Sequence, residues 1–244
     1  LKDNWHVTVV PVTTAFQENT RYDAYMMKNG FTAAFLLGFT QEDRWIKQLS
    51  TTAFPTVLLD NFIPMNPSVG YVGTDSNEGI FSVISHLKQL GHTRIAFLNG
   101  PENSMISQQR HQAFLKSMET LGLSPHKNLI QFGYYGSECA KYFVPDFLEL
   151  GATAIVCSSD IIAVGVIDEC KKKGFRIPED ISIVGFDDIP MCRFTFPALT
   201  TIRQDRINIG KSAFYAMLNQ LNNVHPSSLL LHPELVERAS CAKR

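Results

Sequence analysis

The chain has 244 residues, of which 45% are hydrophobic, and its 22 basic residues against 23 acidic ones leave a formal net charge of -1. This size suits one large α/β domain or two lobes of roughly 100 to 120 residues each. Without a basic surplus, the chain is a poor candidate for binding nucleic acid by itself. Its apolar runs, such as TAAFLLGF from Thr32, are much shorter than the ~18 residues that span a bilayer, so we expect a soluble protein with no membrane partner.

Strand and helix patterns alternate along most of the chain. Apolar runs predict strands at residues 7–10, 33–37, 56–59, 71–73, 94–98, 129–132, 154–157, 181–186 and 200–203. Between several of them lie stretches with helical spacing. In the stretch 76–91, Ser76 is the candidate N-cap, and the apolar positions at i, i+3, i+4 and i+7 are Ile80, Val83, Ile84 and Leu87.

Repeated strand, helix, strand units imply parallel sheets with helices on both faces. The nine predicted strands are many for one small open sheet, so we predict two α/β lobes with a cleft between them. A second helical pattern, at 214–221, follows the last predicted strand.

The cysteines are scattered without CxxC spacing, at Cys139, Cys157, Cys170, Cys192 and Cys241. An odd number in a chain of this length argues against a secreted disulfide framework, and the missing paired spacing argues against a zinc site. We therefore expect reduced, mostly buried thiols in a cytoplasmic protein that holds no metal and no cofactor.

Motifs of the common enzyme classes are absent from the sequence, including GxxxxGK[ST], GxGxxG, HExxH and GxSxG. The histidines show no metal-ligand spacing, and we interpret His92, at a helix-to-strand turn, as a capping or packing residue. In CSSD at 157–160, Ser159 and Asp160 suit the N-cap of a helix over 161–173 better than they suit a nucleophilic site. We predict no catalytic residues.

The stretch SIVGFDDIP leaves alternatives open, because a buried strand pattern ends there in two adjacent carboxylates, Asp187 and Asp188. Ligands of open α/β sheets bind beyond the carboxyl ends of the strands, so one carboxylate can face a ligand. An Asp before a proline-containing loop also caps turns and helices, and these residues favour neither interpretation. A third and weaker interpretation is that the pair of carboxylates holds Mg²⁺ for phosphoryl transfer. This chemistry also uses a Lys and a Ser or Thr, and no residue spacing in the sequence identifies them.

Several motifs resemble the successive signatures of the lactose/galactose-repressor family of transcriptional regulators. In chain order they are VGTDSNEGIFSVISHL, GHTRIAFLNG, RHQAF, SSDIIAVG, FRIPEDISIVGFDDIPMCRFTFPALTTIRQD and LHPELVERAS. The resemblance runs essentially from end to end. It implies a periplasmic-binding-protein-like core of type I, in which two doubly wound parallel-sheet lobes, joined by three crossovers, hold a small effector in their cleft.

The resemblance also implies the lobe boundaries. The N-terminal lobe would comprise residues 1–91 with 205–224, and the C-terminal lobe residues 92–204 with 225–244. The opening NWHVTVVPVT resembles the family's second strand, so we expect the core's first strand and first helix to lie outside this sequence, as the family's helix-turn-helix domain does. An N-terminal lobe short of a central strand would have an unpaired edge.

The resemblance places an effector site at the cleft. Asp187 would hydrogen-bond polar groups of the effector, whereas Asp188 would be structural. Arg110, in SQQRHQAF, matches the family's ligand-binding arginine, and its planar fork suits hydroxyl pairs or a carboxylate.

Three further residues complete the predicted site. Ser159 stands where many members carry an asparagine. Tyr135 matches a position where members place an aromatic ring against the effector, with Tyr134 as a near alternative. Gln204 lies at a crossover, where it can contact the effector directly or through water.

The predicted function is the effector-sensing domain of a transcriptional regulator rather than an enzyme. Its effector would be a small molecule, with a sugar as the first candidate, and its other partners a second copy of the chain and operator DNA, bound through a helix-turn-helix outside this sequence. The alternative is a solute-binding protein of a sugar transport system, which would have the same core.

Overall fold

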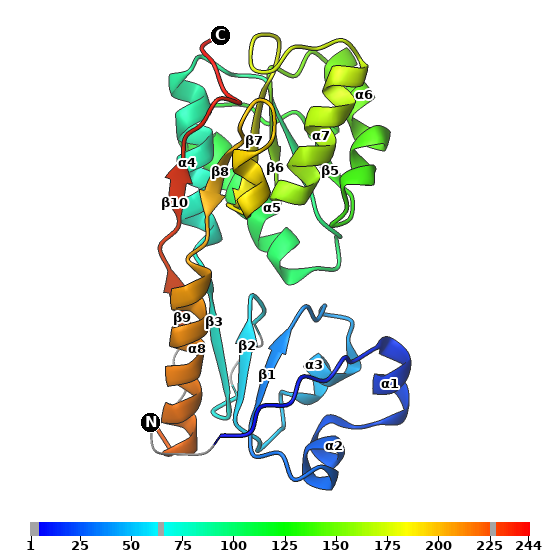
Figure 1. The fold of residues 1–244 in the computed structure, drawn as a ribbon, viewed down its shortest axis with the longest axis vertical. Coiled ribbons are helices and arrows are strands. Elements are labelled where there is room, and N and C mark those ends of the chain that lie inside the picture. The colour runs from blue at the N-terminus through cyan, green and yellow to red at the C-terminus, as the bar shows by residue number, and fades with distance from the viewer. Residues whose placement is uncertain (1–4, 63–65, 225–227) are drawn as a thin grey trace.

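The structure, a computed structural model, describes residues 5–62, 66–224 and 228–244. It contains two sheets that follow one another along the long axis of the molecule (Figure 1). The first sheet is parallel throughout, in the order β1 (Ala34–Leu37), β2 (Thr56–Leu59), β3 (Val69–Thr74) and β9 (Ser228–Leu231). The two sheets form the two lobes of the molecule.

Alternation of side chains along the strands gives the first sheet two apolar faces. On one face, Leu36, Leu58 and Tyr71 pack around Trp45. This face is covered by α1 (Thr14–Asn19), α2 (Tyr22–Lys28) and α3 (Arg44–Gln48). On the other face, Val57 and Val72 pack against α8 (Arg206–Leu221).

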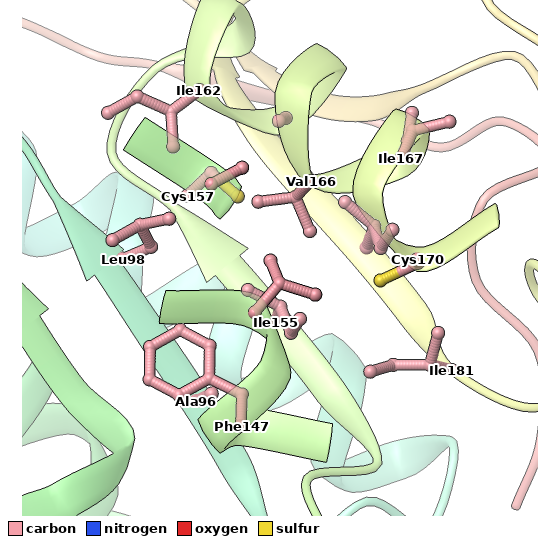
Figure 2. Packing of buried hydrophobic residues seen from close by; sticks show 14 of the residues in the cluster. Ala96, Leu98, Phe147, Ile155, Cys157, Ile162, Val166, Ile167, Cys170 and Ile181 are labelled. Carbon is pink, nitrogen blue, oxygen red and sulfur yellow. The ribbon is translucent and has the colours of Figure 1, made fainter. Parts of the chain in front are cut away.

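The second sheet is built in the same way from six strands. Their order is β10 (Glu234–Val236), β8 (Thr200–Arg203), β7 (Ser182–Asp187), β6 (Ala154–Cys157), β4 (Ile95–Asn99) and β5 (Ile130–Phe132). The β10 strand is antiparallel to β8, and the other pairs are parallel. One face packs against α4 (Ser76–Gln89) and α5 (Met105–Thr120), and the other against α6 (Ala140–Glu149) and α7 (Asp160–Lys172). Figure 2 shows this second apolar cluster, in which Phe147 and Val166 lie over Ile155.

Three segments cross between the lobes, from β3 to α4, from β8 to α8 and from β9 to β10 (Figure 1). The predicted fold class, two parallel-sheet lobes with three crossovers, is therefore confirmed. All but one of the predicted strands are present, with ends shifted by two residues at most.

The strand predicted at residues 7–10 is the exception, because it belongs to neither sheet. A strand forms where a neighbour accepts and donates its backbone hydrogen bonds, and among the described residues this segment has no such neighbour. Val7 and Val9 are consequently 83% and 89% exposed. The β1 strand forms the edge of its sheet, and its Phe35 and Leu37 side chains are exposed as well.

The lobes divide the chain at other places than the predicted boundaries. The chain crosses at Asp75, before α4 rather than after it, and Asp75 instead of Ser76 caps this helix by accepting from the backbone N–H groups of Asn77 and Glu78. The apolar face of α4 packs onto the second sheet, so residues 76–91 do not belong to the first lobe. The β9 strand, expected in the C-terminal lobe, completes the first sheet because it pairs with β3.

His92 and Cys170 of the second lobe lie in buried environments that suit packing roles. His92 is buried, with Nδ1 3.0 Å from the Thr153 hydroxyl and Nε2 3.0 Å from the Ala242 carbonyl oxygen, in agreement with a packing role. All five cysteines are free, and burial raises the pKa of Cys170 to about 12, which keeps its thiol unreactive. Among the residues described, no helix is both long and apolar enough to cross a bilayer.

Candidate functional site

The carboxyl ends of the strands of one sheet face the carboxyl ends of the strands of the other. The β3 strand leads from the first lobe into the second, and β8 leads from the second lobe into the first. Since the other strands of each sheet, apart from the antiparallel β10, run parallel to them, the carboxyl ends of these strands point toward the region between the lobes (Figure 1). Ligands of α/β proteins bind at such ends.

Arg110 lies on α5, at the second-lobe side of this region, and is 4% exposed. Its guanidinium carbon lies 3.7 Å from the centre of the Phe186 ring, and one terminal nitrogen donates to the Ser158 carbonyl oxygen. These contacts fix the plane of the guanidinium. The Arg110 Nε has no hydrogen-bond partner among the described residues, so part of the fork remains free to bind another group.

Asp187 is the last residue of β7, and its Oδ1 accepts a hydrogen bond from Gln204 Nε2. Burial raises the pKa of this carboxyl from its ordinary 3.8 to about 6; the charge of Arg110 opposes the rise, and the carboxylates of Asp160 and Asp60 add to it. Among the described residues, the Gln204 Oε1 is buried without a partner. The predicted site residues Arg110, Asp187 and Gln204 are thus brought together.

The first lobe contributes two residues that the sequence interpretation did not identify, Asp60 after β2 and Tyr71 on β3. Burial raises the pKa of the Asp60 carboxyl, and the positive charge of Arg110, from the opposite lobe, opposes this rise. Burial also raises the pKa of Tyr71 to about 12, and the Asp60 carboxylate adds to this effect. A Cβ on Gly73 would lie 2.6 Å from the Tyr71 hydroxyl and 3.0 Å from the Asp60 Oδ1, so both groups depend on a glycine there.

We call Asp60, Tyr71, Arg110, Asp187 and Gln204 the inter-lobe cluster. Within the described part of the chain, three of its polar atoms are buried without a partner: the Tyr71 hydroxyl, Arg110 Nε and Gln204 Oε1. Unpaired buried polar groups are uncommon in proteins because each costs the free energy of its lost hydration. Their concentration at one place, from both lobes, indicates a site for a polar ligand.

Ser159 and Tyr135 have defined contacts of their own. The Ser159 hydroxyl caps α7 by accepting from the Ile162 N–H at 3.3 Å, which confirms the predicted capping role. The Tyr135 hydroxyl lies 3.0 Å from the Ser107 hydroxyl, one helical turn before Arg110 on α5, and its ring passes so close to Gly100 that a Cβ there would be 2.4 Å away. Contact of either residue with an effector stays a prediction.

Asp188 has a different environment from Asp187. Its carboxylate, 6% exposed, accepts from Arg203 Nε at 2.7 Å and from a terminal nitrogen of Arg238 at 2.6 Å. Burial acts to raise its pKa, but the hydrogen bonds and charges of Arg238 and Arg203 outweigh burial and hold the pKa below its ordinary value. Asp188 is therefore structural, as predicted, but through an ion-pair network rather than a cap: the following helical turn begins at Pro190 with Ile189 as its N-cap.

A cavity of about 730 Å³ opens beside the edge strand β1 and reaches Asn103 of the second lobe. Its walls come mainly from α1, from the loop after β1 and from the start of α3, and none of the five cluster residues lines it. The buried charges lie elsewhere, and we therefore place the candidate site at the inter-lobe cluster. No group of three or more histidine, cysteine or acidic side chains in the described ranges could hold a metal ion.

Comparisons with known proteins agree with this architecture. Residues 84–241 match the family model of the periplasmic binding protein-like domain. The HTH-type transcriptional regulator MalR of Streptomyces coelicolor is 32% identical over 202 residues, which cover 80% of this chain and 58% of that protein. The crystal structure of a regulatory protein of the LacI family from Chloroflexus aggregans is 27% identical, with a TM-score of 0.81 over 90% of this chain and 81% of that one.

The transcriptional regulator CelR, solved as a complex with cellobiose, has the same fold at 22% identity, with a TM-score of 0.82 over 88% of this chain and 68% of that one. Two lobes with a buried polar cluster between their strand ends define a ligand-binding domain. The chain belongs to the periplasmic binding protein-like domain family, and its resemblance to lactose/galactose-repressor regulators is confirmed. It spans little more than half the length of the curated relative, 58% for MalR. Both MalR and CelR are transcriptional regulators rather than transport proteins.

Proposed function

We propose that this chain is the effector-sensing core of a cytoplasmic DNA-binding transcriptional regulator and that a sugar is its effector. The observation that carries the proposal is the inter-lobe cluster, in which the positive charge of the buried Arg110 guanidinium acts on carboxylates from both lobes, Asp60 and Asp187. CelR, a regulator with this fold, has been solved with a disaccharide.

The chemistry of the cluster suits a neutral, hydroxyl-rich molecule. A carboxylate only accepts hydrogen bonds, so Asp60 and Asp187 require donors, which hydroxyl groups supply. The fork of Arg110 requires acceptors, which the same hydroxyl groups also supply. A sugar phosphate fits less well, because its charge would meet two carboxylates in a partly desolvated place.

A ligand that contacts both lobes can couple effector binding to DNA binding. Contacts to both Asp60 and Asp187 can form together only when the lobes keep a particular relative orientation, so binding shifts the population toward that orientation. In the proposed protein a helix-turn-helix outside these residues contacts the operator. The 244-residue chain has a formal net charge of -1, so it has no excess of positive charge with which to bind DNA.

The proposal is tested by a thermal-shift screen of neutral sugars, sugar phosphates and nucleosides. A ligand at a hundredfold excess over its Kd stabilises the fold by about 2.7 kcal/mol, so a neutral sugar is expected to raise the melting temperature. The shift should disappear in Arg110→Ala and persist in Lys116→Ala, a control on the exposed side of the same helix. A melting temperature unchanged by every sugar, or a shift that survives in Arg110→Ala, would contradict the proposed site.

We also propose that the regulator is a homodimer. The loop around the helical turn Pro190–Arg193 exposes a group of large apolar side chains, Met191 at 49%, Phe194 at 83% and Phe196 at 84%. Such groups on a soluble protein mark interaction surfaces, and their burial between two copies would remove them from water. Sedimentation equilibrium should show a dimer that Phe194→Ser with Phe196→Ser dissociates, while Ile207→Ser on α8 leaves it intact. A wild-type monomer at high concentration would refute the dimer.

A further inference from the structure

The backbone is strained at the end of β7, where Asp187 and Asp188 form a sharp corner in the chain. Asp187 and Asp188 are consecutive residues with positive φ, at 123° and 51°, although neither is a glycine. Side-chain-bearing residues rarely adopt such backbone conformations, and they persist only where surrounding contacts hold them. Arg203 and Arg238 hold the Asp188 side chain. The backbone on either side of these two residues contacts Asp160, a fully buried acid at the start of α7.

Asp160 binds the chain just after the corner. Its Oδ2 accepts a hydrogen bond from the Ile189 N–H at 2.9 Å, two residues beyond Asp187. Its Oδ1 accepts from the Thr201 hydroxyl on the neighbouring strand β8. Both oxygens of the carboxylate are thus used, and neither bond is part of an N-cap, because Ser159 caps the helix.

Asp160 also fits closely against the chain just before the corner. Gly185, two residues before Asp187, is the register partner of Thr201 in the sheet. A Cβ on Gly185 would lie 2.2 Å from the Asp160 Oδ1, so the carboxylate occupies the space that a side chain would need. Asp160 therefore contacts β7, β8 and the loop after β7 at one point.

We propose that Asp160 is a positioning residue, which holds the Asp187 carboxylate at the inter-lobe cluster without touching the ligand itself. The significance for binding rests on the proposed function, but the positioning is testable without a ligand. A carboxylate has acceptors for both the Ile189 N–H and the Thr201 hydroxyl, whereas an alanine side chain has none. A sequence interpretation of Asp160 as a helix cap misses this role.

The first test measures amide hydrogen exchange in the ligand-free protein by NMR. In Asp160→Ala the Ile189 amide should exchange at least about tenfold faster, because it loses its acceptor, while the Val156 and Val184 amides in the centre of the sheet stay protected. Asp168→Ala, an exposed substitution on the same helix, should leave Ile189 unchanged. Unchanged exchange at Ile189 in folded Asp160→Ala, or equal acceleration at all three amides, would overturn the proposal.

The second test uses Thr201→Val, which removes one bond to Asp160 but keeps the charges of Arg110, Asp160 and Asp60 that face Asp187. If the corner is released, the Asp187 carboxyl gains water, and its pKa, read from its carboxyl NMR shift, should fall from about 6 toward the ordinary ~4. Thr201→Ser, which keeps the hydroxyl, should restore the higher value. An unchanged pKa in Thr201→Val would show that Asp160 does not position Asp187. Because neither test contains a ligand, failure here is separate from failure of the sugar screen.

Discussion

Asp187→Asn is expected to stabilise the ligand-free protein at pH 7 and, at the same time, to weaken effector binding. Burial raises the pKa of this carboxyl from 3.8 to about 6, so its ionisation costs folding free energy at neutral pH. At ~1.4 kcal/mol per pKa unit, the cost is at most about 3 kcal/mol, and partial exposure of the side chain reduces it. Asparagine keeps the oxygen that accepts from Gln204 and avoids the cost.

The pH dependence of this stabilisation follows from the sign of the shift. A carboxyl whose pKa is higher in the folded state destabilises the fold above pH ~6 and has no such effect below pH ~4, where both states are protonated. Urea unfolding of wild type and Asp187→Asn should therefore differ most at pH 7 and converge near pH 4. A wild type that is as stable as the variant at pH 7 would show that Asp187 carries no burial cost.

The same substitution removes a charged acceptor for the effector. Hydrogen bonds to charged groups contribute roughly 1.5 to 3 kcal/mol, so calorimetry should show affinity falling about 10- to 150-fold. Stability and affinity then change in opposite directions, which a residue retained only for packing would not show. Affinity equal to that of wild type would mean that Asp187 does not face the ligand.

Asp188→Ala is expected to have the opposite effect on stability, with a loss of about 3 kcal/mol or more. The substitution leaves Arg238, which is 12% exposed, without its carboxylate, and removes one of the two acids that bind Arg203. Breaking a buried ion pair from one side typically costs about 3 to 5 kcal/mol, because the remaining charge stays buried; the 38% exposure of Arg203 places the expectation at the lower end.

The matched control is Asp168→Ala, which removes an exposed ion pair with Lys172 and should cause a much smaller loss. Because the pKa of Asp188 is lower in the folded state, its stabilisation is present above pH ~4 and is lost as the pH falls further. Denaturant melts at pH 7 test the expectation. Equal losses in the two variants would show that the Asp188 network contributes no more than a surface pair.

The sequence predicts the second lobe well, because its strands are continuous apolar runs. Ile183, Val184 and Phe186 are buried on both faces of β7, and such runs end abruptly at the polar residues that follow. The same pattern fails at residues 7–10, where an apolar run exists but no neighbouring strand does. Strand formation depends on a partner that local sequence does not reveal.

Helical periodicity shows which face of α4 is apolar, but not which sheet covers that face. For this reason α4 was expected in the wrong lobe. The site shows a similar limit. Arg110, Asp187 and Gln204 are found through family motifs, whereas Asp60 and Tyr71 reach the cluster through the relative placement of the lobes. Locally, the sequence points to these two residues only through Gly73. It lies two residues after Tyr71, and its missing side chain leaves room for the side chains of Tyr71 and Asp60.

The central claim is that an effector binds between the lobes at the cluster of Asp60, Arg110 and Asp187. A crystal structure of the protein with the sugar that most raises its melting temperature tests this claim most directly. The account predicts ligand density between the strand ends, with hydroxyl groups within hydrogen-bond distance of Asp187 and of the Arg110 guanidinium. Density that lies instead in the cavity beside β1, or on an outer face of either lobe, would contradict it.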